Sequence, residues 1–370
     1  MKDENIPADI KSKSLKETRE EIDEILSKLE NKNEDLSDSF NDYQRLIVLN
    51  KHIDSLFKKK LRDISSIKIK KWLRKMIKKR LSQNAKKIDK FLIKYLEKQK
   101  NSLLIHPMKY GVISGGKKIR STIILDAGKI FKISEKKLIN ICAAVECVHS
   151  YSLIHDDLPC MDNDDLRRGK PSTHIKYGEA SAVLAGSSLL TLAFEIITDR
   201  NYSLNSKLKN EIVSSLAKCS GHTGIAGGQE LDLKFEKKNK KLDQIIEMQK
   251  KKTGKLFNFC LYAVGAIANR KDKEKIFLST LGEEIGLLFQ LADDFLDING
   301  SKKLTGKIVK KDKKKGKLTL HKLMGKENSY LYALNLKKKI LRNLEKHGKK
   351  AKDLTNTIRF ILDRNFWWDD

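Results

Sequence analysis

The sequence contains few of the residues that interrupt helices or build covalent frameworks. Its 370 residues include 4 prolines, 20 glycines and 7% aromatic residues, which excludes collagen-like and low-complexity chains. The 5 cysteines are scattered and form no Cys-x-x-Cys pair, so neither a disulfide framework nor a zinc ribbon is expected. The first 14 residues are charged and lack the apolar run of a secretory signal. We therefore expect a cytoplasmic protein in a reducing compartment.

Acidic residues are scarce relative to basic ones. The chain has 77 Lys+Arg against 48 Asp+Glu, a formal net charge of +29, and 64 of the 77 basic residues are lysines. Such a protein binds anions nonspecifically. Its basic residues are not interleaved with stacking aromatic residues, so we expect no sequence-specific nucleic-acid binding.

The charge and the hydrophobic pattern divide the chain into three parts. Residues 1–63 carry 13 basic and 15 acidic side chains, whereas residues 64–110 carry 15 basic and 2 acidic ones. From residue 105 onward, long apolar stretches are separated by short breaks and no alternating strand pattern occurs. We predict an all-α helical bundle over 105–370, a basic linker or first bundle helices over 64–104, and a separate N-terminal unit over 1–63.

The N-terminal unit is predicted to be a helical hairpin. Its first helix has one apolar stripe, formed by Leu15, Ile22, Ile25, Leu26 and Leu29. Its second helix has two apolar runs: Leu36, Phe40, Tyr43, Ile47, and then Leu46, Leu49, Ile53, Leu56. Two helices of this length bury little surface alone. We therefore expect the hairpin to pack on a second copy, a partner or the rest of the chain.

Two further stretches raise the question of a membrane. Residues 64–100 are basic and amphipathic, which suits either an anionic membrane surface or the solvated first helix of the bundle. Membrane contact is therefore compatible with this segment but not required by it. Residues 180–197 approach the length of a membrane span. They contain Glu195 and several hydroxyl residues, so we predict a fully buried core helix.

Two acidic clusters stand out in the apolar stretches of the bundle. They consist of Asp156, Asp157 and Asp162, and of Asp293, Asp294 and Asp297. Pro159 should interrupt the first helix and let Asp162 turn back toward its neighbours, whereas Asp293 and Asp297 share a helix face. Crowded carboxylates at a core-facing position need cations. Oxygen ligands favour Mg²⁺ shared with substrate phosphates; the alternative is a pair of acidic helix ends without metal.

Basic residues accompany these clusters. The run Gly115-Gly116-Lys117-Lys118-Ile119-Arg120 places Lys117 and Arg120 three residues apart, which suits a second anion pocket. Arg167 and Arg168 follow the first cluster and can donate bidentate hydrogen bonds to phosphate. Further candidates are Lys252, Thr253 and Gln290.

Residues 105–365 resemble the all-trans prenyl diphosphate synthases. The motifs that carry the resemblance are the Gly-Gly-Lys-Lys-Ile-Arg run, the stretch from Glu146 to Asp157, its continuation from Asp162 to Pro171, and Phe289 to Asp294. The resemblance implies an isoprenoid-synthase helical bundle with a central cavity and a homodimer. It also implies an enzyme that joins an allylic diphosphate to isopentenyl diphosphate with three Mg²⁺ ions.

The resemblance implies a role for each matching residue. The metal ions would be bound by Asp156, Asp157, Asp162, Asp293, Asp294 and Asp297. The allylic diphosphate would be contacted by Arg167, Lys252, Thr253 and Gln290, which are the predicted catalytic residues, and by Lys307 and Lys317. Isopentenyl diphosphate would be held by Lys117, Arg120, His149 and Arg168. His149 has a second interpretation as a core histidine, and Ser121 stands where the family usually has proline.

The predicted reaction is ionisation, condensation and elimination. The metals and cations stabilise the leaving diphosphate, and no protein base is required because the departing diphosphate can take the proton. Tyr151, with Ser152, lies about one turn before Asp156 and would limit the product to farnesyl diphosphate. Geranylgeranyl diphosphate is the alternative product, and a terpene cyclase-like lyase is a more distant alternative function.

The stretch from Glu21 to Leu61 is similar to the small subunit of exodeoxyribonuclease VII. The similarity rests on Leu29-Glu30, Leu36, Phe40, Tyr43 and the stripe through Leu49 and Leu56. It implies a noncatalytic hairpin that binds the large subunit of that nuclease. The alternative is a helical extension that packs on the synthase or on its dimer mate.

Overall fold

The computed structural model describes residues 6–30, 36–99, 102–113, 115–236, 238–299 and 319–363. The chain divides into two compact units, Met1–Met76 and Ile77–Asp370. The division falls within one long helix, α3 (Leu36–Glu97). Each unit is described by itself below.

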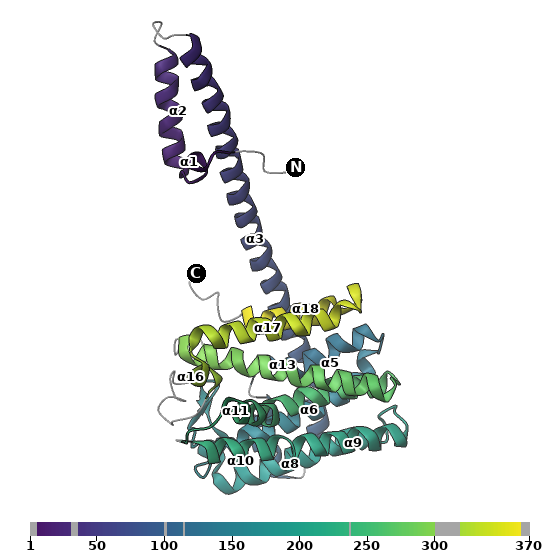
Figure 1. Ribbon diagram of the computed structural model, residues 1–370. Helices are drawn as coiled ribbons and strands as arrows, with labels where there is room; N and C mark the ends of the chain where they lie inside the picture. The colour runs from purple at the N-terminus through teal and green to yellow at the C-terminus, as the bar shows by residue number, and fades with distance from the viewer. Residues whose placement is uncertain are drawn as a thin grey trace. The chain divides into compact units, whose positions relative to one another are not determined.

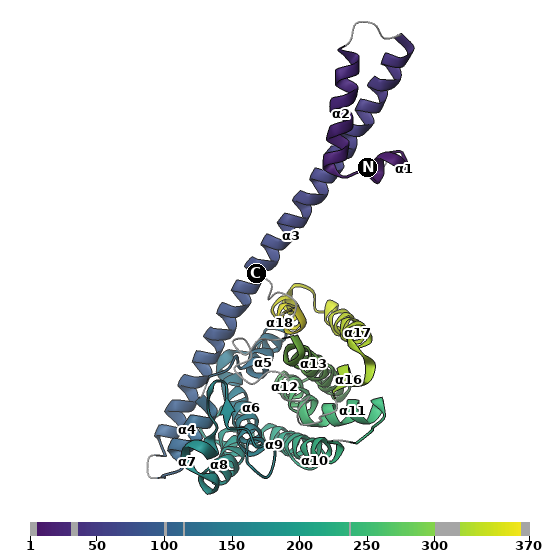
Figure 2. The ribbon, with the colours of Figure 1, turned by 90° about the vertical axis from the view of Figure 1, so that its left-hand side faces the viewer.

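The first unit is a helical hairpin, as Figure 2 shows for α2 (Leu15–Leu29) and the first part of α3. The short helix α1 (Ala8–Lys11) precedes them. Ser14 and Glu17 begin α2 with a reciprocal capping box, in which each side chain accepts a hydrogen bond from the other residue's backbone N–H. The predicted hairpin is therefore present.

The hairpin buries only one of the two apolar runs on its second helix. Its core contains Ile10, Ile25, Leu46 and Leu49. At its edge, Arg45 Nε donates to Glu21 at 2.5 Å. The other run, which includes Phe40, Tyr43 and Ile47, is exposed to solvent.

The second unit is a bundle of helices, which confirms the all-α prediction (Figure 1). Besides the end of α3, its helices are α4 (Ile105–Ile113), α5 (Ile119–Ile130), α6 (Glu135–Asp156), α7 (Thr173–Tyr177), α8 (Glu179–Thr198), α9 (Ser206–Ser220), α10 (Ile225–Phe235), α11 (Leu242–Gln249), the π-helix η1 (Lys250–Gly254), α12 (Lys255–Ile267), α13 (Asp272–Asn299), α16 (Leu320–Met324), α17 (Lys326–Glu345), the 3-10 helix η2 (Gly348–Ala351) and α18 (Lys352–Asp363). The described strands β1 (Leu166–Arg167) and β2 (Lys170–Pro171) form a small antiparallel hairpin.

Helices α6 and α12 lie at the centre of the bundle. Helix α6 packs against α5 and α8, and α12 packs against α13 and α9. Both central helices are apolar around most of their circumference, including Ile141 and Val145 on α6 and Phe257 and Leu261 on α12. A helix of this kind is stable only when neighbours cover it on several sides.

The prediction that residues 180–197 form a fully buried helix is wrong. Helix α8 buries one face, with Ala182, Ala185 and Leu189, while Val183 and Leu184 are 41% and 54% exposed. By length and composition alone, α6 and α8 are both apolar enough to cross a membrane. Such a test is weak evidence, because the core helix of a water-soluble protein also passes it.

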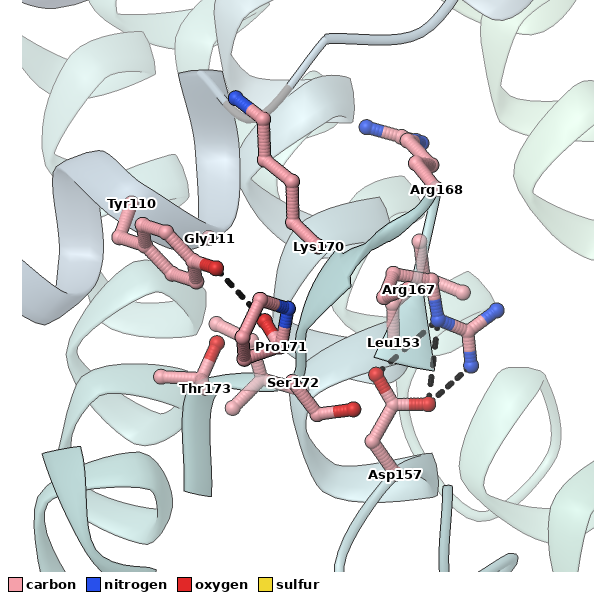
Figure 3. Close-up of a pocket in the computed structure, with 11 residues that line it drawn as sticks. Tyr110, Gly111, Leu153, Asp157, Arg167, Arg168, Lys170, Pro171, Ser172 and Thr173 are labelled. Carbon is pink, nitrogen blue, oxygen red and sulfur yellow. Dashed lines mark hydrogen bonds and ion pairs between the residues drawn. The ribbon is translucent and has the colours of Figure 1, made fainter. Parts of the chain in front are cut away.

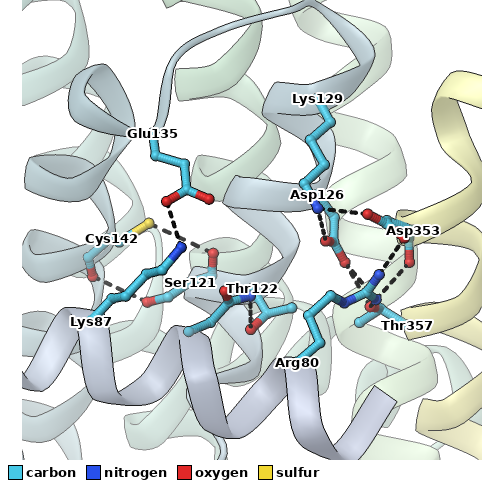
Figure 4. A network of polar contacts seen from close by, with 11 residues as sticks. Arg80, Lys87, Ser121, Thr122, Asp126, Lys129, Glu135, Cys142, Asp353 and Thr357 are labelled. Atoms are coloured by element: carbon cyan, nitrogen blue, oxygen red, sulfur yellow. Dashed lines mark hydrogen bonds and ion pairs between the residues drawn. The ribbon is translucent and has the colours of Figure 1, made fainter. Parts of the chain in front are cut away.

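A buried ionic network joins α3, α5 and α18 (Figure 4). Arg80 Nη2 donates to Asp126 at 3.1 Å and to Thr357 at 2.7 Å, and Thr357 also donates to Asp126 at 2.7 Å. Arg80 and Lys129 both pair with Asp353. Burial raises the pKa of Asp126 to about 6 despite the nearby Arg80. The network fixes the helix that directly follows the glycine-rich run.

Candidate active site

The first acidic cluster lies where α6 ends and the chain turns back. The backbone N–H of Asp162 donates to the carbonyl of Asp156 at 2.8 Å, and that of Asp164 donates to the carbonyl of Asp157 at 3.0 Å. The turn contains Pro159, which cannot continue the helix. The backbone thus returns Asp162 to the end of α6.

Arg167 holds Asp157 with a bidentate contact. Its Nε lies 3.1 and 3.0 Å from the two carboxylate oxygens, and its Nη2 also donates to one of them. Burial opposes the charge of Arg167, but the bonds to Asp157 raise the net pKa of the guanidinium. Figure 3 shows this pair beside a cavity of about 20 Å³, which has room for one water molecule.

Arg168 connects the β-hairpin to the glycine-rich run. Its backbone is in the left-handed region, with φ 55°, at the turn between β1 and β2. Its Nη1 donates to the carbonyl of Gly115. A Cβ on Gly116 would lie 2.8 Å from the guanidinium carbon of Arg168. Gly116 itself has φ 108°, a backbone conformation that favours glycine, and its lack of a Cβ leaves room for this close approach.

The two lysines of the glycine-rich run point to different surroundings. Lys117 is exposed, and its Nζ lies 5.8 Å from the ring centre of Phe360. Lys118 is buried, and its Nζ lies 3.0 Å from the carbonyl of Val112, 3.1 Å from Asp89 and 4.0 Å from Glu146. The buried lysine anchors the run, and the exposed one remains accessible to solvent.

Arg120 and His149 share an environment that lowers the pKa of both side chains. The guanidinium of Arg120 lies 4.7 Å from the ring centre of Phe257. Burial lowers the pKa of Arg120, against the opposing effects of Glu146 and Asp293. Burial, together with Arg120 and Arg168, holds the pKa of His149 well below its usual range. His149 is therefore neutral at physiological pH.

The second acidic cluster is organised by a relay of hydrogen bonds. Thr253 Oγ1 donates to Gln290 Oε1 at 2.9 Å, and Gln290 Nε2 donates to Asp294 Oδ1 at 2.9 Å. Thr253 lies in the π-helix η1, and Gln290 and Asp294 lie one turn apart on α13. Asp294 is buried, whereas Asp293 and Asp297 are partly exposed.

Sequence reasoning missed Asp232, which is paired with a predicted catalytic residue. Lys252 Nζ lies 2.5 Å from Asp232 Oδ2 on α10. The contact requires α10 and η1 to approach closely, and a Cβ on Gly228 would collide with the backbone nitrogen of Lys252. The sequence feature that could have pointed to Asp232 is its position four residues after Gly228, within an apolar helix. Gln229, also buried, has no hydrogen-bond partner for either amide atom among the described residues.

The donor set suits Mg²⁺ that is shared with a phosphate. Within residues 6–30, 36–99, 102–113, 115–236, 238–299 and 319–363, no group of three or more His, Cys, Asp or Glu side chains could hold a metal ion alone. Mg²⁺ commonly takes one or two carboxylates and fills its remaining positions with waters and substrate phosphates. The clusters offer such carboxylates, and the cations around them are suited to a diphosphate.

Tyr151 packs on a histidine that is held by α8. The rings of Tyr151 and His155 are 5.0 Å apart in an edge-to-face arrangement. His155 Nε2 lies 3.0 Å from the carbonyl of Val183. Burial, and then the charge of Asp156, raises the pKa of Tyr151. Ser152 donates to the carbonyl of His149 at 2.9 Å.

Lys307 and Lys317 lie outside the described residues.

The fold is an α-helical bundle, and its acidic and basic side chains suit a metal-bound diphosphate. The sequence model "Polyprenyl synthetase" matches residues 101–360, and the chain belongs to this family of trans-prenyltransferases.

Proteins of similar sequence have names that are consistent with this family. The chain is 38% identical to farnesyl diphosphate synthase of Escherichia coli over 270 residues, which cover 72% of this chain and 90% of that protein. It is 39% identical to geranylgeranyl pyrophosphate synthase 4 of Arabidopsis thaliana over 262 residues, which cover 70% of each.

Solved structures agree as well. An FPP/GFPP synthase from Zymomonas mobilis has a TM-score of 0.69 at 33% identity and covers 78% of this chain and 99% of its own. A geranyltransferase from Helicobacter pylori, complexed with magnesium and isoprenyl diphosphate, has a TM-score of 0.66 at 31% identity. The latter covers 78% of this chain and 97% of its own.

Proposed function

We propose that the chain is a farnesyl diphosphate synthase that condenses dimethylallyl and geranyl diphosphates with isopentenyl diphosphate. The observation that carries the choice of product is Tyr151, a half-buried phenol on α6, the helix that ends at Asp156. A bulky side chain on this helix would obstruct a lengthening tail. Relatives named farnesyl diphosphate synthase support the proposal, and a geranylgeranyl synthase at similar identity makes the longer product the alternative.

Three Mg²⁺ ions are proposed to bind the allylic diphosphate. A relative that is complexed with magnesium and isoprenyl diphosphate supports the choice of metal. The partly exposed Asp156, Asp162, Asp293 and Asp297 are the carboxylates most accessible to the ions. Asp157 is instead held by Arg167, and Asp294 by Gln290. These two contacts fix the position of each cluster. When bound, the ions would stabilise negative charge on the leaving diphosphate.

The protein's own residues would supply binding, orientation and charge. Lys117, Arg120 and Arg168 would hold isopentenyl diphosphate, beside a His149 whose low pKa keeps it a neutral hydrogen-bonding group. Lys252, positioned by Asp232, would contact the allylic diphosphate together with Arg167. The oxygens of Thr253 and Gln290 provide dipoles suited to stabilising an allylic cation.

Product analysis tests the proposal. The purified chain is incubated with Mg²⁺, isopentenyl diphosphate and, separately, dimethylallyl, geranyl or farnesyl diphosphate. We expect the fifteen-carbon product from the first two substrates and little extension of the third. Efficient extension of farnesyl diphosphate would favour the geranylgeranyl alternative. Release of diphosphate from farnesyl diphosphate without isopentenyl diphosphate would favour a lyase.

The nuclease partner of the N-terminal hairpin stays a prediction. Its support is the hairpin fold of α2 and α3 and the exposed apolar residues on it. Full-length chain and the large subunit of exodeoxyribonuclease VII are mixed and separated by size. Co-elution that is lost when residues 1–63 are deleted would support the prediction, and separate elution would contradict it.

A further inference from the structure

One face of α3 in the N-terminal unit presents large apolar side chains to solvent. Phe40, Tyr43, Ile47 and Phe57 are 61%, 58%, 40% and 51% exposed. Single exposed apolar residues are common on protein surfaces, but several large ones gathered on one face usually mark an interface. The row is not part of the hairpin core, which uses Leu46 and Leu49 instead.

The row follows the spacing of a coiled-coil seam. Its positions are Phe40, Tyr43, Ile47, Asn50, Asp54 and Phe57, which alternate steps of three and four residues. At 100° per residue, these six positions fall within one stripe about 100° wide on the side of α3 away from Leu49. We call this row the α3 seam. It therefore has the geometry to pair with one further helix.

The polar residues of the seam decide how two copies could pair. In a parallel pair, each layer sets a residue against itself, so two Asp54 carboxylates would meet in an apolar seam at high electrostatic cost. In an antiparallel pair about a two-fold axis, Phe40 faces Phe57 of the second copy and Ile47 faces Asn50. Tyr43 then faces Asp54, and its phenol can donate a hydrogen bond to the carboxylate. The seam is thus self-complementary in the antiparallel direction.

The area available fits a reversible association. Exposed fractions near one half leave roughly 100 Å² on each large side chain. Four such side chains on each copy give about 800 Å² of buried surface, which is the size of a weak contact, and flanking residues must add more for it to reach the roughly 1,000 Å² expected of a specific interface. Helix α2 packs on the neighbouring face of α3, through Leu46 and Leu49, so pairing would bring four helices together.

We propose that the N-terminal units of two chains associate through the α3 seam as an antiparallel pair, with Tyr43 of each chain hydrogen-bonded to Asp54 of the other. This proposal does not depend on the synthase activity, and it assigns a second copy of this chain to the surface that the hairpin leaves open.

Engineered cysteines test the register in the full-length chain. Cys160 is the exposed native cysteine, so C160S is the background. The double variant Y43C/D54C cannot close a bridge within one helix, because eleven residues span about 16 Å and a disulfide needs about 7 Å or less between Cα atoms. We expect disulfide-linked dimers from Y43C/D54C and almost none from Y43C or D54C alone. Efficient linkage of Y43C alone would indicate a parallel pair and overturn the proposal.

Sedimentation of chains without added cysteines gives a second measurement. At tens of micromolar protein, I47E should lower the apparent mass about twofold, because it places a charge in the seam. L26E is the matched control, since Leu26 is 45% exposed on α2 outside the seam. Turnover by both variants should equal that of the parent, which confirms folding of the catalytic unit. Equal masses for I47E and the parent, together with no disulfide-linked dimer of Y43C/D54C, would reject self-pairing, and so would binding of the seam only to a nuclease subunit.

Discussion

Lys118, in the glycine-rich run, is buried, which is unusual for a charged side chain. Lys118 has a left-handed backbone, with φ 42°, although it is not glycine, and its ammonium is enclosed by Asp89, Glu146 and the carbonyl of Val112. Such a conformation persists only where the surroundings enforce it. Glu146 is further fixed by Ser121, whose hydroxyl donates to it at 2.6 Å. The position of Lys117 and Arg120 therefore depends on Lys118.

We expect K118A to impair the isopentenyl diphosphate site selectively. Loss of the ammonium leaves the buried Glu146 and the partly exposed Asp89 without their cation and releases the loop, so KM for isopentenyl diphosphate should rise about tenfold. KM for geranyl diphosphate should change less than twofold. Steady-state kinetics with each substrate varied in turn measure both values. K109A is the control, because Lys109 pairs with Glu97 at an exposed position. Equal increases in both KM values would contradict a positioning role.

Tyr151 gives a prediction about product length. Truncation in Y151A removes the phenol that packs edge-to-face on His155 and opens space along α6, so we expect twenty-carbon product to become a major fraction. Chromatography of the dephosphorylated products measures the distribution. Y262F is the control, because Tyr262 lies on α12 and donates to Glu211. A product that remains entirely fifteen carbons long would show that Tyr151 does not limit the chain.

At the scale of helices, the hydrophobic periodicity of the sequence predicted where helices form, but it did not predict which side chains contact one another. The long apolar stretches of α6 and α13 predicted helices because burial on several sides leaves a continuous hydrophobic pattern. Pro159 predicted the return of Asp162 because proline cannot continue a helix. The π-helix at Lys252 and Thr253 left no such signal, since one extra residue per turn does not alter composition. Asp232 was missed because its partner, Lys252, lies on a different element.

The choice of buried face could not be predicted from local pattern alone. Both apolar runs on the second hairpin helix have helical spacing, and only the position of α2 selects Leu46 and Leu49 for the core. The same limitation applies to α8, where a mostly apolar composition concealed one exposed face. A sequence specifies which faces are apolar, whereas tertiary packing decides which of them are covered.

The network that joins α3, α5 and α18 gives a pH-dependent prediction. The pKa of Asp126 is raised from 3.8 to about 6 in the folded state, so the folded chain binds more protons than the unfolded chain between about pH 4 and 6. The free energy of unfolding therefore falls as pH rises through this window, by up to about 3 kcal/mol from this group. The D126N variant has no carboxyl group to titrate at this position. The difference in free energy of unfolding, D126N minus parent, should therefore rise by up to about 3 kcal/mol from pH 4 to pH 7.

Thermal unfolding across this pH range measures the difference, which corresponds to several degrees in Tm. D353N is the matched control. Burial opposes the charge of Asp353, but Lys129 and Arg80 outweigh it and lower the pKa of that carboxyl, so its contribution is lost only as pH falls below about 4. D353N should therefore show no relative gain between pH 4 and pH 7. Parallel pH curves for D126N and the parent would contradict the assignment.

At the scale of the whole molecule, the exposed face of α8 is the surface on which we expect the catalytic units to dimerise. Val183 and Leu184 present apolar side chains on a helix whose opposite face is fully packed. Obligate dimer interfaces have this apolar character. We expect L184E to convert the dimer to a monomer and to lower turnover, because a charge at such an interface has no partner. I276E is the control, since Ile276 is a 62% exposed apolar residue on α13.

The measurement is molecular mass at nanomolar concentration, at which the weaker seam of the N-terminal units has dissociated. The parent and I276E should have twice the mass of L184E. Turnover by L184E should recover as its concentration is raised, because mass action favours the dimer. A monomeric parent, or an L184E variant that stays dimeric with full turnover, would show that α8 does not form the interface. Its exposed apolar face would then have to be covered by something other than a second catalytic unit.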